Sequence, residues 1–284
     1  MSASLAIAIW EASAVHAAVS LIETMKVGWR LFALWLQAGL WGLGAGFGLL
    51  LGAVIAYFVQ FSHRLVATVM GFGGGVLIAV LAFELMEEAY SRGGLESTII
   101  GFLTGAVLFC SVNWYLTQRG AKHRKRCGQC VQQPSETKEP GSGSAIAVGA
   151  LLDGIPEAII IGLSLTGGGA VGGTVLIGFF LANVPQGLSS VTGMKEAGRS
   201  ATYIFGLWIS IAILSGVAAV LGYTIFGGFS PKVVAATTAL AAGAVLAMLA
   251  ETMIPEAFEN AQNFIGLITV AGFLAMFILT KMSV

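Results

Sequence analysis

Charged residues are scarce in this chain: of its 284 residues only 10% are Asp, Glu, Lys or Arg, whereas 57% are hydrophobic. A soluble globular domain carries about a quarter charged residues, so the composition excludes that class and predicts an all-α polytopic membrane protein. The 14 basic and 14 acidic residues leave no formal net charge. This balance excludes nucleic-acid binding that depends on bulk basicity.

Aspartate and histidine are scarcer still. Asp153 is the only Asp in the chain, which excludes an intramembrane aspartyl protease because that enzyme needs two. The three histidines, His16, His63 and His123, fall outside the predicted spans. A serine-type intramembrane protease needs Ser and His together at membrane depth. We therefore expect no enzyme activity.

Long apolar runs, in contrast, are abundant, and about 20 residues suffice to cross the hydrocarbon core as a helix. Eight such runs predict eight transmembrane helices, at Ala38–Phe58, Leu65–Ala89, Ser97–Leu116, Ala145–Leu165, Val171–Val191, Ala201–Phe226, Val233–Ile254 and Phe264–Leu279.

The predicted organisation has four parts. Residues 1–37 form an N-terminal interfacial helix or an extra, ninth span; the interfacial helix is favoured because Glu11, His16 and Glu23 interrupt the apolar run. Residues 38–116 hold helices one to three, 117–144 a polar loop, and 145–284 helices four to eight. Six Lys and Arg residues lie in the loop, so the positive-inside rule predicts that it is cytoplasmic.

The same loop contains the motif CGQC, formed by Cys127 and Cys130, with His123 four residues earlier. A single CxxC without a second ligand pair is a weak signal. A metal sensor, a redox pair and a plain linker all remain open, and the plain linker is favoured.

An internal repeat relates the second and seventh spans. A shift of 168 positions lays Gly75–Tyr90 over Gly243–Phe258 and matches six residues. Five crossings separate the two stretches, so they run in opposite directions. The pattern predicts an inverted repeat of the kind found in secondary transporters.

The fourth span carries two acids and a proline, Asp153, Pro156 and Glu157, in an otherwise apolar run. The acids are four residues apart and share one helix face. A proline inside a helix removes a backbone hydrogen bond and frees a carbonyl oxygen. Charged groups at membrane depth are costly and usually face an ion, a cavity or a partner. We therefore predict a cation site here, the alternative being a helix-end kink with paired acids.

The fifth span repeats this arrangement with neutral oxygen donors, since Asn183 and Gln186 flank Pro185. Amide oxygens can coordinate a cation without adding charge. Hydrogen bonding between helices is the alternative role of such side chains in membranes.

Two further spans contribute candidate ligands. Glu251 and Thr252 lie in the seventh span, where Glu251 is predicted to be a second acid at membrane depth. Glu256 is expected at a solvated helix end. In the second span Glu84 and Glu88 share a face near the outer end, where they could form a funnel that concentrates cations or be simply solvated.

These motifs resemble those of the ZIP (Zrt/Irt-like protein) family of divalent metal transporters, over about residues 38–279. The family's fourth-span pattern is His-Asn-x-Pro-Glu, in which Asp153 takes the His position and Glu157 matches the Glu. In the fifth span Asn183 fits the family's Asp or Asn, whereas Gln186 stands where the family has Glu. The seventh-span ligands of the family fall at Glu251 and Thr252.

The resemblance implies eight helices in a 3+2+3 inverted-repeat arrangement, an elevator-like motion and a homodimer. It further implies that the chain transports divalent metal ions (zinc, iron or manganese) towards the cytoplasm, with a bacterial inner membrane as the expected location. The substituted positions favour a single-metal site of oxygen ligands only, which suits hard cations such as Mn²⁺ and Mg²⁺ and still permits Zn²⁺. The open alternatives are a non-transporting metal sensor and a carrier of another small cation.

Overall fold

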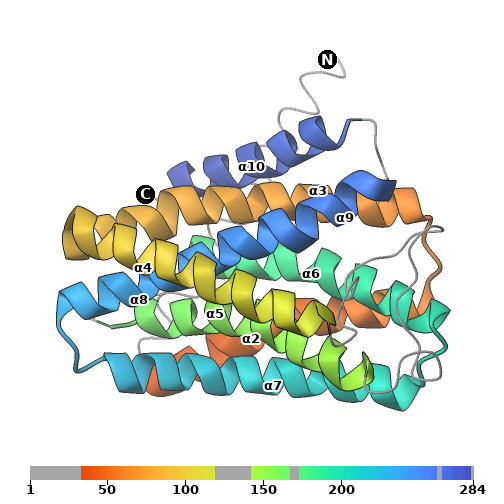
Figure 1. Cartoon of the computed structure of the whole chain (residues 1–284), viewed down its shortest axis with the longest axis horizontal. Coiled ribbons are helices and arrows are strands. Elements are labelled where there is room, and N and C mark those ends of the chain that lie inside the picture. The colour runs from red at the N-terminus through yellow and green to blue at the C-terminus, as the bar shows by residue number, and fades with distance from the viewer. Residues whose placement is uncertain (1–32, 119–141, 167–172, 261–263, 283–284) are drawn as a thin grey trace, which may run out of the picture.

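A computed structural model describes residues 33–118, 142–166, 173–260 and 264–282, and all regular elements in these ranges are helices (Figure 1). The α-helices are α2 (Leu34–Phe58), α3 (His63–Val80), α4 (Met86–Leu116), α5 (Ser142–Ser164), α6 (Gly173–Glu196), α7 (Ala201–Phe226), α8 (Pro231–Met248), α9 (Ile254–Asn260) and α10 (Ile265–Met282). Two π-helices, η1 (Leu81–Leu85) and η3 (Leu249–Met253), interrupt the series. Residues 1–32 and the CGQC motif lie outside the described residues.

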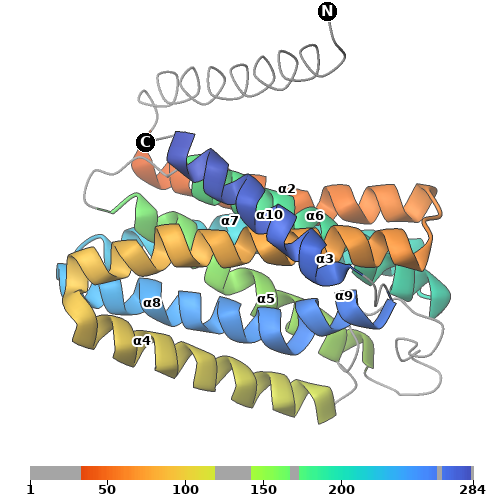
Figure 2. The ribbon, with the colours of Figure 1, turned by 90° about the horizontal axis from the view of Figure 1, so that it is seen from above.

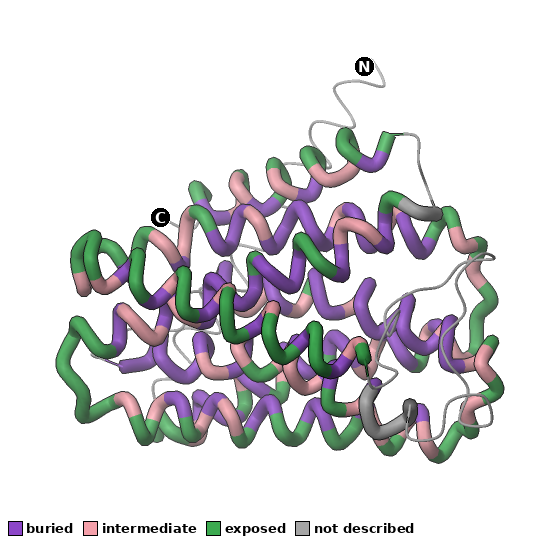
Figure 3. The backbone as a smooth tube through the Cα atoms, in the orientation of Figure 1, coloured by how far each residue is buried: buried purple, intermediate pink, exposed green. Residues whose placement is uncertain are grey.

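Seven helical runs in the described residues are long and apolar enough to cross a membrane. They lie side by side as one bundle (Figures 1 and 2). The helices differ in burial: within the apolar 18-residue stretch of each helix, 72% of the residues are buried in α6 but only 22% in α10 (Figure 3). The exposed side chains of α10 include Leu267, Val270, Leu274 and Ile278. An apolar outer surface of this kind suits lipid, and the fold is that of a helical membrane-spanning protein.

The longest of these runs, His63–Leu116, has 54 residues. A straight helix of that length would measure about 80 Å, more than twice the ~30 Å hydrocarbon core. The run is broken at Gly94, where φ is 73° and ψ is 178°. Glycine adopts this backbone conformation without the penalty that a Cβ brings. The chain reverses there, so the rest of α4 returns beside α8 (Figure 2).

The two stretches matched in the sequence have the same secondary structure. In the first, an 18-residue α-helix (His63–Val80) leads into a five-residue π-helix (Leu81–Leu85). In the second, an 18-residue α-helix (Pro231–Met248) leads into a five-residue π-helix (Leu249–Met253). Each boundary in the second stretch lies 168 positions after its counterpart in the first. Because π-helices are rare, these shared boundaries are much stronger evidence of an internal repeat than six shared residues, five of which are Gly, Ala or Leu.

Glycines allow the close helix contacts that define the bundle. A Cβ added at Gly187 of α6 would collide with the carbonyl oxygen of Leu49 on α2, and one added at Gly52 would collide with that of Val184. Gly75 of α3 makes an equally tight contact with the carbonyl of Thr269. Helices that touch along such small-residue seams pack backbone against backbone.

Polar groups fix the helix ends. The Ser62 and Ser200 hydroxyls accept hydrogen bonds from the amides of Leu65 and Tyr203, which caps the first turns of α3 and α7. At the same end of the bundle, Lys195 Nζ donates to the Tyr57 carbonyl at 2.6 Å. This bond satisfies a carbonyl in the last turn of α2 and joins the ends of α2 and α6.

Candidate cation site

Helix α5 buries both of its acids. Asp153 is 4% exposed and Glu157 is 2% exposed. Pro156 lies within the helix. Since proline has no backbone N–H, the carbonyl of Leu152 four residues earlier loses its usual helical partner. By this general rule, a carbonyl oxygen without its helical donor lies beside the two carboxylates.

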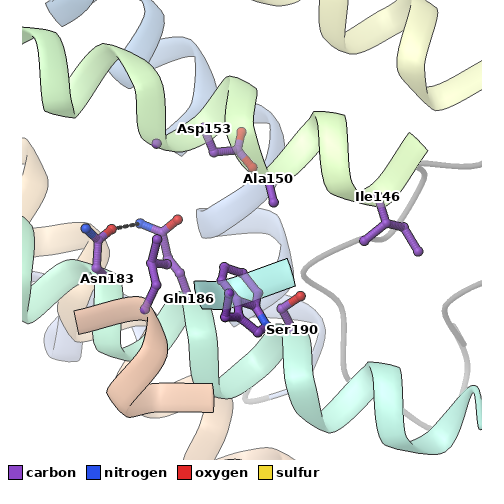
Figure 4. A pocket seen from close by; sticks show the side chains of 9 residues that line it. Ile146, Ala150, Asp153, Asn183, Gln186 and Ser190 are labelled. Atoms are coloured by element: carbon purple, nitrogen blue, oxygen red, sulfur yellow. Dashed lines mark hydrogen bonds between the residues drawn. The ribbon is translucent and has the colours of Figure 1, made fainter. Parts of the chain in front are cut away.

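Helix α6 buries the two amides, since Asn183 is 4% exposed and Gln186 is 3% exposed. Asn183 Nδ2 donates to the carbonyl oxygen of Ala45 on α2 at 3.1 Å. Gln186 Nε2 in turn donates to Asn183 Oδ1 at 3.3 Å (Figure 4). The chain of two bonds starts from a backbone group of α2, so it fixes the orientation of the Gln186 amide.

A small cavity lies between these helices. It has a volume of about 10 Å³, which holds about one water-sized sphere. Its walls come from α2, α5, α6 and α7, and they consist of Leu49, Ile146, Ala150, Asp153, Gly154, Asn183, Gln186, Ser190 and Trp208 (Figure 4). The structure thus brings together three of the seven predicted ligands, Asp153, Asn183 and Gln186. Glu157 lies one turn further along α5.

The other three predicted ligands do not line this cavity. The carboxylate of Glu251, on η3, accepts a 2.6 Å hydrogen bond from Asn113 Nδ2 on α4, and the Cys110 side chain also hydrogen-bonds to it. Its side chain is exposed, whereas those of Asp153 and Glu157 are buried. Thr252 Oγ1 donates to the Met248 carbonyl at 2.7 Å within its own helix.

Glu84, the last of the three, is only half-buried and lies on η1. Glu88, its partner in the predicted funnel, pairs with Arg92 at 3.0 Å. Arg92 Nη1 also donates to the Thr166 carbonyl at 3.4 Å, which links α4 to the end of α5. The Arg92 guanidinium offsets part of the negative charge that a funnel would need.

The sequence patterns did not predict the positions of two further residues, Trp208 and Glu256. Trp208 of α7 lines the cavity but lies in an apolar run, where a tryptophan usually signals packing alone. Glu256 is 5% exposed, so the expectation of a solvated helix end was wrong. Helix α9 extends the seventh run to Asn260, beyond the predicted end at Ile254, so Glu256 lies within a helix rather than at its end.

The ligand set is mixed. Within the described ranges, no three His, Cys, Asp or Glu side chains lie together as a metal-binding group. A cation at the cavity would therefore draw on carboxylate oxygens together with amide, hydroxyl or backbone oxygens. Such ligands suit hard cations better than soft ones.

No family model matches this chain, and no curated protein matches its sequence. The geometry of the site and the ZIP-like motifs are accordingly the grounds on which a function can be proposed.

Proposed function

We propose that this protein is a secondary transporter that moves divalent cations across a membrane towards the cytoplasm by alternating access. One observation carries the proposal: Asp153 of α5 and Gln186 of α6, both buried, line one cavity inside a bundle of membrane-spanning helices. A buried acid in such a position is costly unless it serves an ion, a cavity or a partner.

The course of the chain favours the same proposal. If the reversal at Gly94 separates two crossings, the seven apolar runs make eight transmembrane helices. The helix pair α8 and η3 repeats the lengths and spacing of α3 and η1, 168 positions later. This is expected of an inverted repeat, with α5 and α6 between the two halves in a 3+2+3 arrangement. Transporters with inverted repeats hold their substrate near the membrane midplane, between the repeats.

ZIP-family membership is part of the proposal and depends on the motifs around Asp153, Glu157, Asn183 and Gln186. On this basis Glu157 and Asp153 are the charged ligands, Gln186 adds a neutral oxygen, and Asn183 orients Gln186 rather than binding the metal. A bacterial inner membrane and a homodimer follow from the resemblance alone.

Uptake into proteoliposomes tests the proposal. Purified protein is reconstituted, and Mn²⁺, Fe²⁺, Mg²⁺, Ca²⁺ and Zn²⁺ are offered outside vesicles that contain a cation-sensitive dye. We expect saturable uptake of at least one divalent cation, absent from protein-free vesicles and from vesicles with the double variant Asp153→Ala, Glu157→Ala. Binding without uptake in monodisperse protein would indicate a sensor. If the protein neither binds nor takes up any of these cations, the cation site is refuted.

A further inference from the structure

Trp208 of α7 lines the cation cavity and carries a hydrogen-bond donor, its indole N–H. Its side chain is 2% exposed and lines the cavity together with Asp153, Gln186 and Ser190. Helix α7 lies against α5 at this level, because a Cβ added at Gly154 would lie 4.0 Å from Ile211 Cγ2, one turn beyond Trp208. The indole Nε1 is buried and finds no acceptor among the described residues.

An indole N–H can only donate a hydrogen bond. A buried donor without an acceptor is costly, and such groups are rare in folded proteins. A metal cation cannot accept a hydrogen bond and is repelled by the positive end of an N–H dipole. The Trp208 wall of the cavity therefore suits an oxygen atom, and the cation itself belongs nearer the carboxylates.

Other residues of the cavity lining carry hydrogen-bond acceptors. Asp153 presents carboxylate oxygens. Gln186 Nε2 donates to Asn183, so the other end of the amide, Oε1, is the end that can accept. The cavity volume of about 10 Å³ accommodates about one water molecule. A water there could accept from Trp208, donate to Asp153 and Gln186, and still offer one lone pair to a cation.

From this arrangement we infer that the cavity is a water subsite, and that the transported cation, bound beside it by the carboxylates, keeps at least one water molecule, which the indole N–H holds. The inference rests on the proposed function and narrows the substrate class. Mg²⁺ loses its water reluctantly, and Mn²⁺ shares its preference for oxygen and water ligands. Among the described residues, the cavity lining contains neither Cys nor His, the ligands that most zinc sites use. A site of oxygen and water ligands therefore favours Mn²⁺ and Mg²⁺ over Zn²⁺.

The variant Trp208→Phe tests the subsite, because it removes the N–H and keeps an aromatic ring. In proteoliposomes we expect the half-saturating Mn²⁺ concentration to rise about threefold to tenfold, the effect of losing one hydrogen bond. The value for Zn²⁺ should change less than twofold. Trp114→Phe is the matched control, since Trp114 is 67% exposed on α4, and it should leave both values unchanged.

A second measurement does not depend on transport. Electron–nuclear double resonance of Mn²⁺ bound to the purified wild-type protein should show proton couplings of a bound water that vanish in D₂O. Trp208→Phe should weaken or remove them. Couplings absent from the wild type, or equal in both proteins, would overturn the water subsite, as would an unchanged Mn²⁺ to Zn²⁺ ranking. A wild-type protein that carries no divalent cation would instead overturn the proposed function.

Discussion

Replacing Glu157 by Gln is the sharpest test of the cation site. The change keeps the shape and nearly the volume of the side chain but removes its charge. Because Glu157 is 2% exposed, its charge acts where little water screens it. Hydrogen bonds and contacts to charged groups are worth about 1.5–3 kcal/mol, so a loss of about 2 kcal/mol in cation binding is expected. That corresponds to an affinity about thirtyfold lower.

The assay is cation uptake by reconstituted, monodisperse Glu157→Gln protein, with half-saturation and maximal rate measured for Mn²⁺, Fe²⁺ and Zn²⁺. Glu251→Gln is the matched control, an acid-to-amide change at an exposed carboxylate on η3. Its amide oxygen can still accept the hydrogen bond from Asn113 Nδ2, so half-saturation should stay within about twofold of the wild type. Wild-type rates and half-saturation for all three cations in Glu157→Gln would refute the assignment of Glu157 as the central ligand.

Three further predictions concern other residues. Asp153→His should shift the ranking of metals towards Zn²⁺, because imidazole is a softer ligand than carboxylate; equal rankings in uptake would argue against Asp153 as a ligand. Gly187→Ala should lower the free energy of unfolding in detergent by about 1–3 kcal/mol, because its Cβ would collide with the Leu49 carbonyl. Gly206→Ala is the control and should leave it unchanged, since a Cβ at Gly206 would have no atom within 4 Å. Cys127 and Cys130 should resist a membrane-impermeant maleimide added outside intact cells and react after permeabilisation; labelling of intact cells would reverse the predicted orientation.

Hydropathy predicted much of the fold, because the hydrocarbon core allows only long apolar helices in an α-helical protein. The predicted span Ala201–Phe226 has the bounds observed for α7. The sequence pattern also predicted that Asp153 and Glu157 face an ion, a cavity or a partner, and both side chains are buried.

The π-helices could not be predicted from hydropathy, and they change which face of the helix the later side chains occupy. Sequence patterns assume 3.6 residues per turn, and the extra residue of a π-turn rotates all later side chains by about 100°. Glu256 lies just beyond η3 and is buried, whereas a solvated helix end was expected. Trp208 was not predicted for another reason: from the sequence alone, a tryptophan in an apolar run that lines a cavity cannot be distinguished from one that packs against its neighbours.

The two buried acids of α5 also determine how the membrane voltage would act on the transporter. Ionised, Asp153 and Glu157 bring two negative charges into the low-dielectric interior. A divalent cation cancels both, so the loaded site would cross the field without electrical work. The unloaded site would keep its charge, and each elementary charge that crosses the field gains or loses about 2.3 kcal/mol per 100 mV. In the proposed transport cycle, the voltage-sensitive step would therefore be the return of the empty carrier.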